Sequence, residues 1–193
     1  MSAPEIESFC PASRAEWRAW LKKHHLRKTS VWLICYKKKS NKPSLSWSEA
    51  VEEALCFGWI DSVRKPIDEE KFMQFFGKRK ARGTWSKVNK EKVAQLIQAG
   101  LMMPAGLQSI ELAKQNGSWT ILDQVEELHI APDLQAAFDA LPGSGEFFHR
   151  LSKSVRKAIL QWLVLAKLPA TRQKRIQEIA SLAAQGQKPK QFR

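Results

Sequence analysis

The residues best suited to chemistry lie between positions 71 and 92, and the chemistry they suggest is the binding of anions. The stretch KFMQFFGKRKARGTWSKVNKEK holds eight basic residues and a single acid. Ser86 has the position of an N-cap for a helix over 87–99, whose first turn holds Lys87 and Lys90, where acids are more usual. Because the free N–H groups of a helix start attract anions, this pattern predicts an anion site.

The candidate binding residues are cationic, aromatic or hydrogen-bonding side chains of this stretch and of the GWID motif: Arg79, Arg82, Trp85, Ser86, Asn89, Trp59 and Asp61. The planar guanidinium forks of Arg79 and Arg82 match carboxylate and phosphate groups. Trp85 offers a flat face for stacking, and Ser86 and Asn89 offer hydrogen bonds from one helical turn. The alternative is a solvated basic loop, in which Ser86 only caps the helix and Trp85 packs in the core.

Sequence signatures of catalysis, metal binding and cofactor binding are missing. The chain contains no P-loop, no G-x-G-x-x-G fingerprint, no G-x-S-x-G elbow and no H-E-x-x-H pair. His129 and His149 stand alone, as structural histidines usually do. We therefore predict a protein without metal or cofactor that binds rather than catalyses. The alternative enzyme would act on a small anionic substrate, with Arg79 and Arg82 as its clamp.

The cysteines and the apolar runs bear on the cellular compartment. Cys10, Cys35 and Cys56 form no C-x-x-C pair, and the last two lie in the apolar runs VWLICY and ALCFGW. Such cysteines are typically reduced and buried. No apolar run approaches the roughly 20 residues that cross a bilayer, and the first residues lack the basic and apolar regions of a secretory signal. We predict a cytoplasmic protein without a membrane span.

The charge distribution widens the choice of partners. The chain has 32 basic and 19 acidic residues, a net charge of +13. Residues 1–97 hold 20 basic and 11 acidic residues, residues 98–149 hold one and seven, and residues 150–193 hold 11 and one. Two basic blocks flank an acidic middle. They either neutralise it within one molecule or bind anions such as nucleic acid, phosphates or acidic lipid headgroups.

Local patterns predict an α+β fold. The capping box Ser13-x-x-Glu16 predicts the start of a helix over 14–25. A second capping box, Ser46-x-x-Glu49, predicts the start of a helix that continues to Leu55. The apolar run Val31–Tyr36 predicts a strand, and the turn signal Pro66-Ile67-Asp68 between 59–65 and 71–76 predicts a hairpin. The N-terminal part therefore forms a small antiparallel sheet with helices.

The rest of the chain is predicted to be helical. Apolar stripes predict helices over 87–99, from Pro104 to Asn116 and from Pro132. Residues 150–186 predict two antiparallel helices joined at Leu168-Pro169, and LPGSGEFF (141–148) has the composition of a linker. We assign residues 1–125, with the GWID and WSxxN motifs, to an α+β domain and residues 126–193 to a helical domain.

Five segments in this order resemble the bacterial YdeI/OmpD-associated family of bacteriocin-protection proteins: LCFGWIDS (55–62), TWSKVNKEK (84–92), AGLQSIELAKQNGSW (105–119), LSKSVRKAILQWL (151–163) and AKLPATRQKRIQEIASLAAQGQKP (166–189). The resemblance extends from Trp17 to Pro189. The chain departs from the family at Gly77-Lys78-Arg79, where a Thr-Pro-Arg run is usual, and at Gly83, where a serine precedes the Trp-Ser pair.

The resemblance implies a role in stress or antimicrobial resistance and brings no established catalytic residues. Combined with the charge pattern, it favours a non-enzymatic cytoplasmic protein that binds an anionic small molecule or an acidic protein surface. The second hypothesis is a nucleic-acid-binding module that holds phosphates with its basic blocks and stacks bases on exposed tryptophans.

Overall fold

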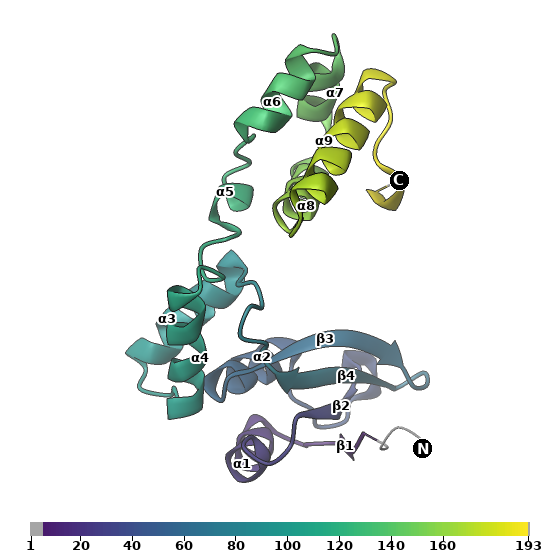
Figure 1. Ribbon diagram of the computed structural model, residues 1–193. Coiled ribbons are helices and arrows are strands. Elements are labelled where there is room, and N and C mark those ends of the chain that lie inside the picture. The colour runs from purple at the N-terminus through teal and green to yellow at the C-terminus, as the bar shows by residue number, and fades with distance from the viewer. Residues whose placement is uncertain (1–5, 193) are drawn as a thin grey trace, which may run out of the picture. The chain divides into compact units, whose positions relative to one another are not determined.

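The structure is a computed structural model that describes residues 6–192 (Figure 1). The chain divides into two compact units, the first ending at Trp119 and the second beginning at Thr120. The first unit combines a sheet with helices, and the second is helical. The predicted α+β class is thus confirmed. Within the described residues, no helix is both long and apolar enough to span a membrane.

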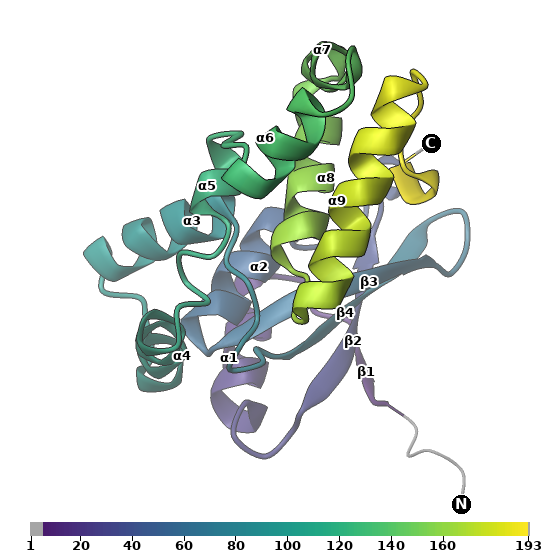
Figure 2. The same cartoon turned by 45° about the horizontal axis from the view of Figure 1, so that its top comes forward.

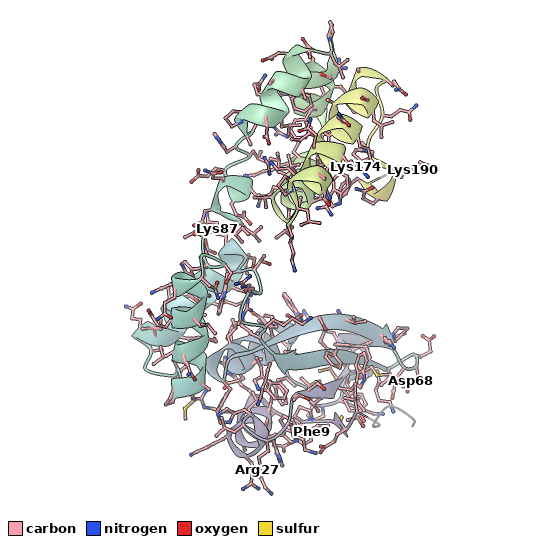
Figure 3. All side chains as sticks on the ribbon, viewed as in Figure 1. Phe9, Arg27, Asp68, Lys87, Lys174 and Lys190 are labelled. Carbon is pink, nitrogen blue, oxygen red and sulfur yellow. The ribbon has the colours of Figure 1, made fainter. Side chains whose placement is uncertain are left out.

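The sheet of the first unit has four strands in the order β1-β2-β4-β3. Its strands are β1 (Ser8–Phe9), β2 (Ser30–Tyr36), β3 (Trp59–Pro66) and β4 (Lys71–Lys78). The predicted hairpin of β3 and β4 is confirmed, and Asp68 shapes its turn by accepting the backbone N–H groups of Glu70 and Lys71 at 2.8 and 2.7 Å (Figure 3). The sheet is mixed rather than wholly antiparallel, because β1 pairs parallel to β2. A two-residue strand leaves no periodic pattern in the sequence.

Four α-helices complete the first unit: α1 (Arg14–His24), α2 (Trp47–Cys56), α3 (Lys87–Gln98) and α4 (Pro104–Gln115), with a short 3-10 turn η1 (Lys38–Ser40). The predicted N-caps are present. Ser46 and Glu49 form a reciprocal capping box on α2, and Ser13 caps α1. These caps set the helix starts because they satisfy backbone N–H groups that lack a partner within the helix.

The core of the first unit lies on one face of the sheet. Val31, Leu33 and Cys35 of β2 are buried there, and the Phe76 ring of β4 lies 5.4 Å from that of Trp17 on α1. Side chains alternate between the two faces of a strand, so the residues between these point the other way. That second face, which we call the outer face, carries half-buried residues instead.

The second unit consists of helices around its own core: α5 (Asp123–Glu126), α6 (Pro132–Asp139), α7 (Ser144–Arg150), α8 (Lys153–Val164) and α9 (Pro169–Ala184), with a 3-10 turn η2 (Lys190–Phe192). The predicted pair of C-terminal helices is confirmed, since α8 and α9 lie side by side (Figure 1, Figure 2). Ile179 is buried in this core, and Trp162 packs against it.

The predicted linker at 141–148 is wrong. Ser144 begins helix α7, is fully buried and donates its hydroxyl to the Phe138 carbonyl at 3.1 Å. The ring of Phe148 packs 5.2 Å from that of Phe138 in the core. Pro and Gly here mark a tight turn at Gly143, where φ is +82°, and two buried phenylalanine rings hold the turn in the core.

All three cysteines are free thiols, and we expect them to differ sharply in reactivity. Cys35 and Cys56 are buried, and burial raises the pKa of Cys35 to about 11, whereas Cys10 is exposed. Because the thiolate is the reactive form, a disulfide reagent at pH 8 should modify one thiol rapidly in the native protein and three in urea. Cys10→Ser should remove the rapid phase. More than one rapidly reacting native thiol would contradict this expectation.

Candidate functional site

Arg79 follows strand β4 and is held by three contacts. Its backbone N–H donates to the Gly58 carbonyl at 2.9 Å, and its Nη2 donates to the Thr84 carbonyl at 2.6 Å. Its guanidinium carbon lies 3.6 Å from the centre of the Trp85 ring. Stacking on an aromatic face suits a planar, weakly hydrated cation. These contacts fix the position of the guanidinium group.

One nitrogen of this guanidinium group is buried without a hydrogen-bond acceptor from the described residues. Nη1 of Arg79 has no hydrogen-bond partner among residues 6–192. Burial lowers the pKa of Arg79 to about 10, although the nearby Asp61 carboxylate opposes this shift. A buried cationic donor without an acceptor is costly, because it loses its hydration and gains no bond in return. Such a group would be stabilised by an anionic oxygen that reached it from the hollow.

Arg79 lines a hollow of about 380 Å³ at the end of the sheet. The sheet contributes Ile60, Ser62, Phe75 and Gly77, and the following loop contributes Lys78, Lys80, Gly83 and Thr84. The hollow therefore combines an apolar floor on the outer face with a cationic wall. Lys78 directs its ammonium group to the Leu26 carbonyl at 2.9 Å, so Arg79 and Lys80 supply the charge for a ligand.

The loop that carries Arg79 is tied to the end of α4. Asn116 Nδ2 donates to the Ala81 carbonyl at 2.8 Å, and the Trp85 ring lies 4.9 Å from that of Trp119. The ammonium group of Lys114 lies 5.7 Å from the Trp119 ring centre. The segments TWSKVN (84–89) and QNGSW (115–119) thus meet in the fold through Trp85 and Trp119, and Asn116 also binds the loop at Ala81.

The structure separates the other sequence candidates from this hollow. Ser86 caps α3 by accepting the Asn89 N–H at 3.3 Å. Arg82 is exposed in the loop before α3, whereas Trp59 is fully buried in the core. Asp61 lies on the inner side of β3 and accepts the Trp47 indole N–H at 2.9 Å. Of the seven candidates, Arg79 and Trp85 are brought into direct contact.

At the start of α3 the first lysine has a partner. Lys87 lies 4.0 Å from Glu91 in an exposed i,i+4 pair (Figure 3). Such a pair contributes little to stability. The hollow at Arg79, which holds a buried guanidinium group, is therefore the better candidate for a binding site.

A network of ion pairs around α2 was not predicted from the sequence. Glu53 is buried and accepts Nε of Arg14 and Nη1 of Arg18, each at 2.6 Å. Glu52 accepts Lys92 Nζ of α3 at 2.6 Å. Two adjacent acids in the otherwise apolar helix AVEEALC were the available signal. The network joins α1, α2 and α3, and gives these charges a structural role.

Side chains of the types that bind metals do not cluster within residues 6–192. No group of three or more histidine, cysteine, aspartate or glutamate side chains is arranged there to hold a metal ion.

Comparison with protein families assigns the two parts of the chain differently. Residues 9–109, slightly more than half of the chain, match the family described as Domain of unknown function (DUF8412). The chain belongs to this family. Residues 127–186 match the family described as Bacteriocin-protection, YdeI or OmpD-Associated. That match confirms the resemblance for the C-terminal part only, and the extension to Trp17 is not supported.

Comparison with individual proteins adds no relative. No curated protein matches the chain, and no solved structure matches it. The DUF8412 match covers strands β2, β3 and β4 and the hollow beside Arg79, and the second match lies within the helical unit. The residues of the hollow therefore belong to the domain whose function is unknown.

Proposed function

We propose that this protein binds a small anionic ligand in the hollow beside Arg79. The observation that carries the proposal is the buried Nη1 of Arg79, for which the part of the chain described provides no acceptor. A carboxylate or phosphate oxygen would supply that acceptor in a charge-assisted hydrogen bond. Lys80 adds a second positive charge, and Phe75 and Ile60 offer apolar contact to the rest of the ligand.

The loop geometry supports a preformed site. The Arg79 guanidinium is clamped between the Thr84 carbonyl and the Trp85 ring before any ligand arrives. Gly83 donates its N–H to the Lys80 carbonyl at 2.8 Å and closes a tight turn beside the hollow. Little ordering of the protein is then needed when an anion binds, and this favours affinity.

We place this binding in the setting of bacteriocin protection, by a non-enzymatic mechanism in the cytoplasm. The family description that residues 127–186 match supports the setting of bacteriocin protection alone. A net charge of +13 disfavours direct capture of cationic peptides, so the partner in such a role is anionic.

The proposal is tested by thermal shift and calorimetry with inorganic phosphate, acetate and citrate at low ionic strength. An anion that binds the folded state should raise the melting temperature of the wild-type chain by mass action. Arg79→Gln should weaken binding at least about tenfold, because a charge-assisted bond contributes roughly 1.5–3 kcal/mol. Arg27→Gln is the charge-matched control, since Arg27 is exposed at the end of α1 (Figure 3).

A further variant separates the hollow from the start of α3. Arg82→Gln should retain binding if the ligand sits beside Arg79, because Arg82 is exposed in the loop. Loss of binding in Arg82→Gln with full binding in Arg79→Gln would place the anion at the helix start instead. Equal affinity in both variants and the wild type would refute a site at either place.

A further inference from the structure

The outer face of the sheet is unusual for an antiparallel sheet with one buried face. Such a face is normally polar because it meets water. Here it carries the half-buried side chains of Trp32 and Ile34 on β2 and of Met73 and Phe75 on β4. The polar Gln74 points instead to the inner side, where it is buried. An apolar and aromatic surface of this kind marks an interaction site.

Aromatic rings and cations on this face form one continuous strip. Trp32 and Phe75 are direct cross-strand partners, and their ring centres lie 5.1 Å apart, edge to face. The ammonium group of Lys65 on β3 lies 5.1 Å from the Trp32 ring centre. Phe75 also lines the hollow that holds Arg79. We define the outer strip as Lys65, Trp32, Phe75 and Arg79.

The charge around the strip favours a polyanion. Residues 1–119 hold 21 basic and 12 acidic residues. The acidic side chains of the hairpin have partners of their own. Glu69 and Glu70 pair with lysines at 2.9 and 2.6 Å. Asp61 accepts a hydrogen bond from Trp47 on the inner side of the sheet. Apart from Asp61, which lies near enough to Arg79 to act on its charge, these acids do not compete with a ligand for the cations of the strip.

We propose that the outer strip binds single-stranded nucleic acid, with a phosphate at Arg79 and successive bases against Phe75 and Trp32. The inference rests on the proposed function, because the phosphate occupies the same hollow. Cationic grooves with aromatic side chains are the general means of holding single strands, since every base has a face that stacks. A duplex keeps its bases stacked on one another, so the rings of the strip have no access to them.

The test is fluorescence anisotropy with the 193-residue chain and labelled 12-mers of thymidylate and uridylate, against a duplex of the same length. We expect the single strands to bind more tightly than the duplex, and binding to weaken from 50 to 200 mM salt. Trp32→Leu and Phe75→Leu should each weaken single-strand binding about tenfold, because stacking on one ring contributes that much or more. Lys65→Gln should weaken binding and reduce the salt slope.

Controls separate the strip from general attraction to a basic protein. Trp47→Leu removes an exposed tryptophan that lies apart from the strip and should leave the affinity unchanged. Circular dichroism of each variant establishes that the fold is retained, and the two aromatic variants provide independent tests. Equal binding of duplex and single strand, with no loss in Trp32→Leu or Phe75→Leu, would overturn the inference. So would an absence of binding at 50 mM salt.

Further outcomes distinguish this inference from the proposed function. One outcome is that phosphate raises the melting temperature of the wild type but not of Arg79→Gln, while the 12-mers do not bind. In that case the nucleic-acid inference is wrong and the proposed anion site is supported. If the 12-mers bind and Arg79→Gln changes neither phosphate nor 12-mer affinity, the anion site fails. If sedimentation shows a dimer that Trp32→Leu dissociates, the strip is an interface between two copies and the inference is wrong.

Discussion

Gly106→Ala is expected to destabilise the first unit by about 3 kcal/mol, the largest effect of any conservative substitution considered. Gly106 lies in the first turn of α4, where the helix meets the end of α2. A Cβ atom there would stand 2.3 Å from the Cys56 carbonyl oxygen and 2.8 Å from that of Leu55. Both neighbours are backbone atoms, so neither can rotate away.

The local architecture explains why the two helices come so close. The Met103 N–H donates to the same Cys56 carbonyl at 3.0 Å and holds the start of α4 against α2. Gly58, with φ of +72°, ends α2 beside Ala105, where its own Cβ would stand 2.8 Å from the Ala105 carbonyl oxygen. A methyl group at position 106 therefore has to break the Met103 bond or push the helices apart, and either change disturbs core packing.

Urea unfolding followed by tryptophan fluorescence measures this effect, because seven of the eight tryptophans lie in residues 1–119. The comparison variant is Gly145→Ala in α7, whose unfolding is followed by circular dichroism because only Trp162 of the eight tryptophans lies in residues 120–193. A Cβ at Gly145 would meet Phe138 at an ordinary 3.7 Å, so this change should be neutral or stabilise by up to about 1 kcal/mol. Wild-type stability in Gly106→Ala would show that α4 does not pack against α2 as described.

Glu53→Gln is expected to lower the free energy of unfolding by about 2 kcal/mol. The Glu53 carboxylate is 3% exposed and accepts from two arginines, Arg14 and Arg18. Breaking a buried ion pair costs roughly 3–5 kcal/mol, and this cost is reduced here because the arginine side chains retain about a third of their exposure to water. An amide keeps one acceptor oxygen but turns its NH₂ group toward a cation.

The same urea titration at pH 7 tests this expectation, with Glu69→Gln as control. Glu69 pairs with Lys39 at 2.9 Å, but its side chain is 93% exposed. An exposed pair contributes less than about 1 kcal/mol, so Glu69→Gln should unfold almost as the wild type does. Equal effects of the two substitutions would mean that the pairs around Glu53 do not join α1 to α2.

The candidate site was only partly predictable, and the reason is visible at Arg79 and Arg82. Both arginines occur in one basic run and look equivalent in sequence. The fold buries the first against Trp85 and leaves the second exposed. Phe75 was assigned to a strand, but its position beside Arg79 depends on how strand β4 leads into the loop.

The sequence by itself determined most of the longer helices, the hairpin and the α+β class. Their signals are local: the capping box at Ser46 and Glu49 lies within four residues, and the turn at Asp68 binds N–H groups two and three residues away. Interactions over so short a range leave a recognisable pattern in a short window of sequence.

Only the tertiary structure decided which charged side chains are buried, which aromatic rings pack against one another and how the segment at 141–148 folds. Arg18 donates to the Leu101 carbonyl across 83 residues, and Asn116 reaches Ala81 across 35. Such contacts depend on helix positions that packing of the whole core sets, and no pattern in a short window encodes them. For the same reason the Pro and Gly of 141–148 indicated a break, while the burial of Ser144 and Phe148 decided that a helix forms there.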